Sequence, residues 1–286
     1  MIFSRLMSSR SLQAFSDTDE KHFLTTMRGF SKLLEGIVKY SLFDKQHTMF
    51  QLKVCGNKPN PLSMIFGCMD SRVFPSRYTN SDLGDNYIVR NAGNFVPYPD
   101  DLNQIGNITS AAGALELTCV RNNMKHVVVA GHSDCKAMGL LFDLRSEIDV
   151  PTGSPLELWI KKHGKRTLEK FSYLTEANNF TGPVPFTQES LEDKKFEIKI
   201  DPEQNFYIVD KLSQVNCIQQ LENISAYPFL KERLNKNKLF LHALWYDVNS
   251  GNVYMLSKTQ QKFVEINESS FFSLIEEVQT EEAEAG

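Results

Sequence analysis

Residues 64–72 read MIFGCMDSR, and this stretch decides how the rest of the chain is interpreted. Its apolar start is typical of a buried β-strand. Because alternate residues of an extended segment face the same side, Cys68, Asp70 and Arg72 can point together into one cleft. Reactive groups on open α/β sheets lie just past the carboxyl ends of the strands. Taken alone, the stretch fits equally well a core cysteine followed by a surface ion pair.

A second stretch, VVVAGHSDC at residues 127–135, repeats the pattern of a buried strand followed by polar side chains. It places His132 and Cys135 at the end of that strand. By itself this spacing would indicate a hydrogen-bonded core histidine. Combined with Cys68, it predicts two sulfur ligands and one nitrogen ligand, a set that suits a catalytic zinc ion with its fourth position open for water.

Three segments together resemble the signature segments of the β-class carbonic anhydrases: CMDSR at 68–72, RNAGN at 90–94 and GHSDC at 131–135. They occur in the family's order and near its spacing. The resemblance is close over 62–138 and looser from residue 23 to residue 266. The chain looks most like the animal, mitochondrial branch, because Lys136 and Ala137 stand where plant and bacterial members usually have two glycines.

This resemblance implies a zinc lyase that reversibly hydrates carbon dioxide to bicarbonate and a proton, with Zn²⁺ held by Cys68, His132 and Cys135. Zinc-bound hydroxide would attack carbon dioxide, because the metal brings the pKa of its water toward neutrality, as in the unrelated three-histidine carbonic anhydrases. The Asp70–Arg72 dyad would orient that hydroxide, with Arg72 keeping Asp70 ionised. In a closed state, as in some family members, Asp70 would instead be the fourth zinc ligand.

The chain departs from the family's pattern at several positions. Pro59 and Leu117 stand where plant members carry a glutamine and a tyrosine, which puts the usual substrate hydrogen bond from that glutamine in doubt. Ile65 replaces the tryptophan that marks the bacterial form with an inhibitory bicarbonate site, so we predict no such site. Tyr87 and Phe95 are candidates for the apolar wall beside the substrate.

The remaining pattern predicts an α/β fold. We expect a mostly parallel sheet of about four strands with an antiparallel edge strand, flanked by helices and preceded by an N-terminal helical arm over 23–40. The strands are expected at 64–67, 86–90, 127–130 and 239–247, with the antiparallel return at 253–257. The helices are expected at 110–120, 136–144, 156–174, 206–224 and 227–234. Residues 177–205, polar and rich in proline, are expected to form a long surface excursion.

Composition narrows the classes of protein to which the chain can belong. Of 286 residues, 41% are hydrophobic and 23% are charged, as in ordinary globular proteins, and the net charge of −4 gives no sign of a nucleic-acid partner. No apolar run reaches the ~20 residues that a membrane span needs. Five cysteines without dense spacing favour a reducing compartment, and we interpret Cys55, Cys119 and Cys217 as structural.

The two ends of the chain differ from its middle. Residues 1–16 contain arginines and serines but no acid, which predicts a mitochondrial transit segment; a cytoplasmic location with a frayed basic arm is the alternative. Residues 17–275 are expected to form a single domain. The acidic tail over 276–286 follows, with disorder expected from residue 279. The family is oligomeric, with clefts at subunit interfaces, so we expect at least a homodimer.

Other interpretations of the same residues stay open. One is a hydrolase of carbon disulfide or carbonyl sulfide on the same zinc site. Another is a zinc- or redox-sensing binding protein with a closed site and no turnover. A zinc nucleobase deaminase is poorly supported, because its His-x-Glu pair is missing at 132–134. We interpret His163 as part of a solvated face and His242 as a core histidine, which is also kept as the reserve metal ligand.

Overall fold

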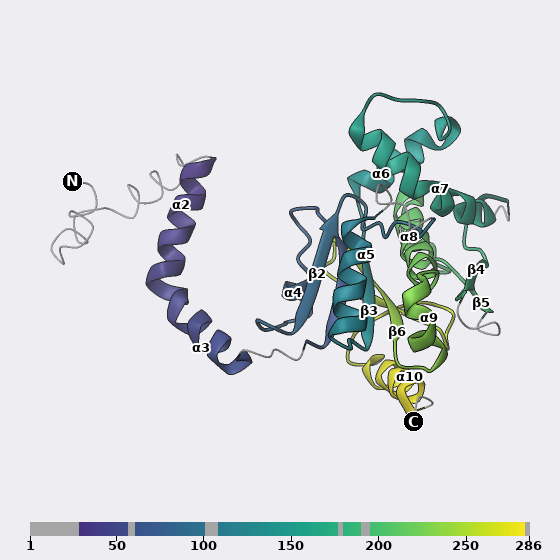
Figure 1. Ribbon diagram of the computed structural model, residues 1–286. Coiled ribbons are helices and arrows are strands. Elements are labelled where there is room, and N and C mark those ends of the chain that lie inside the picture. The colour runs from purple at the N-terminus through teal and green to yellow at the C-terminus, as the bar shows by residue number, and fades with distance from the viewer. Residues whose placement is uncertain (1–28, 57–60, 101–107, 177–179, 190–194, 284–286) are drawn as a thin grey trace. The chain divides into compact units, whose positions relative to one another are not determined.

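The computed structural model describes residues 29–56, 61–100, 108–176, 180–189 and 195–283 (Figure 1). By its internal contacts the chain divides into two compact units, residues 1–58 and 59–286. The transit segment expected over 1–16 lies outside the described residues. No helix in the part of the chain that the structure describes is both long and apolar enough to cross a membrane.

The described part of the first unit, residues 29–56, is helical. It contains α2 (Phe30–Lys39), a π-helical segment (Tyr40–Asp44) and α3 (Lys45–Cys55), so the expected arm is confirmed from Phe30 onward and continues as helix well beyond residue 40. Along the whole of α2 no residue is buried. Its apolar stripe is instead exposed, at Phe30, Leu33, Leu34 and Ile37.

A six-stranded sheet organises the second unit. Its strands are β1 (Ser63–Cys68), β2 (Asn86–Asn91), β3 (His126–His132), β6 (Phe240–Tyr246), β7 (Val253–Ser257) and β8 (Lys262–Glu265). They lie in the order β2-β1-β3-β6-β7-β8; the first four are parallel, and β7 and β8 are antiparallel. The predicted mostly parallel sheet with an antiparallel edge is confirmed, and β8 extends that edge by one strand that the sequence analysis did not foresee.

The strand order reverses direction between β1 and β3. The chain leaves β1 toward β2 on one side, through the short helix α4 (Pro75–Tyr78), and it leaves β3 toward β6 on the other side. Connections that diverge from neighbouring parallel strands open a crevice at their carboxyl ends, where α/β proteins bind ligands. The stretch after Cys68 and the stretch after His132 both begin at this point.

Helices cover the sheet. The crossover from β2 to β3 is α5 (Ser110–Leu115) with a π-helical continuation (Glu116–Arg121), as expected. Helix α8 (Ile208–Ser225) packs directly on β3 and β6, and α6 (Lys136–Asp143) and α7 (Pro155–Glu176) pack against α8 (Figure 1). A 3₁₀ turn (Pro228–Leu230) and α9 (Lys231–Asn235) lead into β6.

Helix α8 is buried on nearly all sides, although its sequence contains several amides. Three of these amides satisfy backbone groups of the loop after β2. Asn216 Nδ2 donates to Gly93 O (3.0 Å), Gln220 Oε1 accepts from Val96 N (2.8 Å) and Asn223 Nδ2 donates to Val96 O (2.8 Å). Buried polar groups are costly unless paired, so these bonds hold the loop in one position beside the crevice.

Two expectations for the polar segments are wrong. The stretch 177–205 contains the hairpin β4 (Val184–Thr187) and β5 (Lys195–Ile198), whose Val184, Phe186 and Ile198 side chains are buried, so it is not a plain surface excursion. The acidic tail is helical through Ala283, in α10 (Phe271–Ala283). Two of its acids have partners in the fold: Glu277 accepts from the Lys258 amide at 2.6 Å, and Glu281 lies 2.8 Å from Lys258 Nζ. Contacts with other parts of the fold therefore order segments that their composition predicted to be exposed or disordered.

Candidate metal centre

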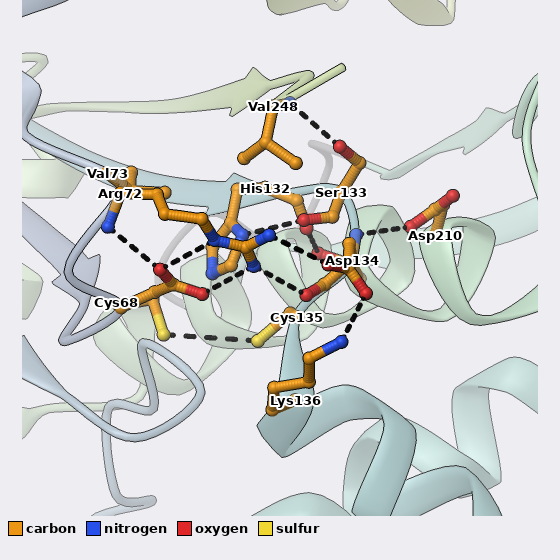
Figure 2. A network of polar contacts seen from close by, with 12 residues as sticks. Cys68, Arg72, Val73, His132, Ser133, Asp134, Cys135, Lys136, Asp210 and Val248 are labelled. Atoms are coloured by element: carbon orange, nitrogen blue, oxygen red, sulfur yellow. Dashed lines mark hydrogen bonds and ion pairs between the residues drawn. The ribbon is translucent and has the colours of Figure 1, made fainter.

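The two cysteines of the predicted site lie together at the crevice. Cys68 is the last residue of β1, and Cys135 immediately precedes the first turn of α6. Both side chains are buried, and their Sγ atoms are 3.9 Å apart (Figure 2). Residues 67 positions apart in the chain are thus brought into direct contact by the parallel pairing of β1 with β3.

His132 completes the cluster. Its ring Nδ1 is 2.8 Å from the carbonyl oxygen of Ser133, so Nδ1 carries the proton and the lone pair is on Nε2. That Nε2 is buried and has no hydrogen-bond partner among the described residues. One ligand atom from each of Cys68, His132 and Cys135 lies within 4.8 Å of the others. A buried lone pair that faces two sulfur atoms is the arrangement that a soft divalent cation satisfies.

The pKa shifts of the two cysteines also indicate a metal site. A hydrogen bond from the Cys135 thiol, opposed by burial, lowers the pKa of Cys68, which makes Cys68 the thiolate of the pair. That thiolate, together with burial, raises the pKa of Cys135 well above its ordinary value, although the amides of Ala137 and Met138 act in the opposite direction. Like charges this close cannot both ionise unless a cation lies beside them. The three residues therefore fit a metal ion, and two thiolates would balance its charge.

Arg90 holds the loop that presents Cys68. Its Nε donates to Cys68 O (2.8 Å), and its Nη2 donates to the carbonyl oxygens of Asp70 (2.6 Å) and Val73 (2.7 Å). This role of Arg90 was not expected from the sequence. Its place at the end of a predicted parallel strand was the available signal, because all such ends meet at one edge of the sheet.

Asp70 and Arg72 form the predicted pair. Arg72 Nε and Nη2 donate to Asp70 Oδ1 and Oδ2 at 3.0 and 2.7 Å, and this contact holds the pKa of Asp70 well below its usual range. Arg72 also bonds a second acid that was not foreseen: its Nη1 is 2.8 Å from Asp134 Oδ2. Asp70 thus pairs with Arg72 and lies outside the cluster of three ligand atoms.

Hydrogen bonds from two serine hydroxyl groups hold the backbone at His132 and Ser133 in place. Ser213 Oγ of α8 donates to the carbonyl oxygen of His132 at 2.8 Å. Ser133 Oγ donates to Asp247 Oδ1 (2.7 Å) and accepts from the Val248 amide (2.8 Å), as Figure 2 shows in part. Asp247 follows β6, another parallel strand, so its position at the carboxyl edge could also have been recognised from the sequence.

Comparison with known proteins identifies the family. A family model described as carbonic anhydrase matches residues 63–253. Beta carbonic anhydrase 1 of Caenorhabditis briggsae is 36% identical over 254 residues, which cover 87% of this chain and 93% of the relative. Its counterpart in Caenorhabditis elegans is 34% identical, with coverage of 87% and 92%. The chain belongs to the β-carbonic anhydrase family.

Solved β-carbonic anhydrases share the fold. The β-carbonic anhydrase CcaA is 25% identical, with a TM-score of 0.60 over 84% of this chain and 92% of that one. A structure described as one of two tetrameric β-carbonic anhydrases from Sordaria macrospora has a TM-score of 0.56 at 20% identity, over 80% and 96%, and shows the fold alone. The predicted resemblance, including that to animal members, is confirmed.

Three secondary expectations about this carbonic anhydrase need correction. His242 is not near the cluster. It is the register partner of Val128 on the neighbouring strand, and its Nε2 lies 3.1 Å from His126 Nδ1, so it is no reserve ligand. His163 is not on a solvated face; its ring packs on Trp159 with centroids 4.2 Å apart, and burial lowers its pKa to about 4.

Tyr87 is the third correction, because it does not line the crevice of its own chain. It lies four residues before the end of β2, and its hydroxyl accepts from Asn122 Nδ2 at 2.9 Å, near the opposite edge of the sheet. Phe95, the other wall candidate, lies in the loop beside the crevice but is fully buried against Trp159. Within this carbonic anhydrase chain, neither ring forms an exposed wall next to the ligands.

Proposed function

We propose that this enzyme is a zinc-dependent carbonic anhydrase that interconverts carbon dioxide and bicarbonate, with Zn²⁺ held by Cys68, His132 and Cys135. The observation that carries the proposal is the buried Nε2 of His132, unpartnered among the described residues and grouped with two sulfur atoms within 4.8 Å. Sulfur and imidazole ligands favour zinc over magnesium or calcium. Three protein ligands leave a fourth position, as catalytic rather than structural zinc sites do.

The metal and the protein would make different contributions to the reaction. A bound zinc ion would supply Lewis acidity, the means by which metalloenzymes make a nucleophile from water at neutral pH. The protein's part is orientation. Asp70 Oδ1 already accepts two hydrogen bonds, from the amide and Nε of Arg72, whereas Oδ2 accepts one among the described residues, from Nη2 at 2.7 Å. Oδ2 therefore has a lone pair left to accept a hydrogen bond from the attacking water.

Arg72 keeps Asp70 suited to that task. The bidentate contact favours the ionised carboxylate, which accepts hydrogen bonds and donates none. The same contact must break before Asp70 can become a fourth ligand in a closed state. We propose that breaking the Asp70–Arg72 pair separates the two states, with the described structure on the open side.

The test is stopped-flow hydration of carbon dioxide from pH 6 to 9, on purified protein with its zinc content measured. We expect one zinc per chain and activity that rises with pH. Cys68→Ser should lose zinc and activity, whereas the matched variant Cys119→Ser, at another buried cysteine outside the cluster, should keep both. Asp70→Asn should keep zinc and lose most activity.

Two outcomes would contradict the proposal. One zinc per chain without activity at any pH would favour the binding-protein interpretation or another substrate, such as carbon disulfide. Full activity in Asp70→Asn would refute the role of the dyad while leaving the zinc site intact.

We also propose that the enzyme forms at least a homodimer. Support comes from α2, whose exposed apolar residues (Phe30, Leu33, Leu34 and Ile37) fit a protein partner better than water. The Sordaria macrospora neighbour is described as tetrameric. Gel filtration with light scattering is the measurement, and a stable monomer would contradict this proposal.

The compartment is a separate proposal. The arginine- and serine-rich composition of residues 1–16 supports import into mitochondria. A fusion of these residues to a fluorescent protein should reach mitochondria, and a cytoplasmic signal would favour the alternative.

A further inference from the structure

We propose that Asp134 is a positioning residue for the reaction: it anchors the far edge of Arg72, so that the near edge of Arg72 stays aligned with Asp70. This inference rests on the proposed function of the Asp70–Arg72 pair. It concerns a residue between two of the ligands, in the HSDC segment, whose own side chain was given no role by the motif.

The guanidinium of Arg72 bonds two acids, Asp70 and Asp134, and Figure 2 shows it beside Asp134. Its Nε and Nη2 face Asp70, at 3.0 and 2.7 Å. Its Nη1 donates to Asp134 Oδ2 at 2.8 Å, and Nη2 donates also to the backbone carbonyl of Asp134 at 3.0 Å. Four of the five N–H donors of an arginine are thus used. Two contacts on each edge fix the plane of the group.

Asp134 is itself held in place from two other directions. Its backbone has φ of 50°, in the left-handed region that aspartate and asparagine tolerate better than most residues. Its amide donates to Asp210 Oδ1 (2.8 Å), in the first turn of α8, and its Oδ1 lies 2.7 Å from Lys136 Nζ. The buried helix α8 is thereby connected, through Asp134, to an arginine near the surface.

Such an anchor matters because Arg72 is a long side chain near the surface. Its side chain is 44% exposed, and long exposed side chains have several rotamers available. A single exposed ion pair restrains such a side chain weakly, whereas pairs with two acids on opposite edges of the guanidinium restrain it more firmly. With Asp134 removed, Asp70 would keep a partner whose orientation varies, and the lone pair of Oδ2 would point less consistently toward the attacking water.

The experiment compares kcat/KM for carbon dioxide and zinc content in Asp134→Ala, Asp134→Asn and the wild type. We expect Asp134→Ala to keep zinc and to lose roughly three- to tenfold in kcat/KM, the effect of one charge-assisted contact. Asp134→Asn should stay within about twofold of wild type, because its amide oxygen can still accept from Nη1 and asparagine tolerates the positive φ. Asp149→Asn is the matched control, since it removes another exposed aspartate from a 2.7 Å ion pair, with Lys165, and should leave kcat/KM unchanged.

A second background separates positioning of Arg72 from strain in the loop. In Arg72→Lys, which cannot bridge both acids, adding Asp134→Ala should change kcat/KM by less than about twofold, because coupled residues are non-additive. An independent readout is the Nε–H NMR signal of Arg72, assigned by its loss in Arg72→Lys. Its hydrogen exchange should be faster in Asp134→Ala than in the wild type.

Several outcomes would overturn the inference about Asp134. Wild-type kcat/KM and wild-type exchange in Asp134→Ala would overturn the inference, as would an equal loss of activity in both backgrounds. An increase in kcat/KM would also overturn it, because Asp134 would then weaken the grip of Arg72 on Asp70. If the wild type has zinc but no activity, the proposed function fails, and the exchange measurement still tests the anchor.

Discussion

Gly131 lies at a point where α8 approaches β3 too closely for any side chain. A Cβ added there would come closer than 3.0 Å to Cys217 Sγ, and it would lie 3.1 Å from Trp245 Cδ1 and 3.3 Å from Ser213 Oγ. All three neighbours are buried, and two of them belong to the helix that supports His132. We therefore predict that Gly131→Ala destabilises the fold and displaces the adjacent ligand.

The magnitude follows from the packing. Overfilling a close-packed core typically costs about 1–3 kcal/mol. Replacing glycine by alanine recovers about 0.4–1 kcal/mol, because it restricts the unfolded chain. The net loss should be roughly 1–2 kcal/mol, which lowers the Tm by about 2–4 °C for each kcal/mol in a chain of this size. Thermal unfolding at fixed protein and zinc concentrations is the measurement.

A double-mutant cycle isolates the clash. Cys217→Ala removes the Sγ that meets the new Cβ, so Gly131→Ala should cost little in that background, and the coupling should be about 1–2 kcal/mol. Gly113→Ala is the matched control: it lies in α5 with no atom within 4 Å of an added Cβ, and it should stabilise by about 0.5–1 kcal/mol. Additive losses in the cycle, or a Gly131→Ala protein as stable as the wild type, would refute this reasoning.

Two further predictions concern Arg90 and His163. Arg90→Met should weaken zinc binding measured by chelator competition and lower stability by about 2 kcal/mol or more, because three backbone carbonyls lose a charged donor; unchanged affinity would argue against its loop-holding role. The folded protein binds a proton at His163 only near pH 4, whereas the unfolded chain binds it near 6.5. Stability should therefore fall as the pH drops from 6.5 to 4, by up to roughly 3 kcal/mol from this group. His163→Phe keeps the aromatic contact and should show a smaller fall in Tm over that range; an identical pH dependence would contradict the assignment.

The strands and the candidate ligands could be predicted from the sequence because each depends on residues close together in the chain. The apolar runs that end at Cys68 and His132 are short and followed by polar residues, which is enough to indicate buried parallel strands. The spacing of His132 and Cys135 identifies candidate ligands for the same reason. The tail and the stretch 177–205 were misjudged because groups in them have partners in other segments: Glu277 accepts from the Lys258 amide, Pro185 O accepts from Lys170 Nζ, and Glu203 pairs with Lys262.

The sequence by itself determined the fold class, the family resemblance and the three candidate ligands, since apolar runs indicate the strands and the polar residues that follow two of them indicate the ligands. Only the tertiary structure decided which other residues serve the centre. Arg90, Asp134, Asp210 and Asp247 come from four separate segments, and their hydrogen bonds join groups up to 114 positions apart. The structure also excluded His242 as a metal ligand, because its ring lies against His126 of the neighbouring strand. The physical reason is that a hydrogen bond depends on distance and direction in space, whereas a sequence pattern records only order along the chain.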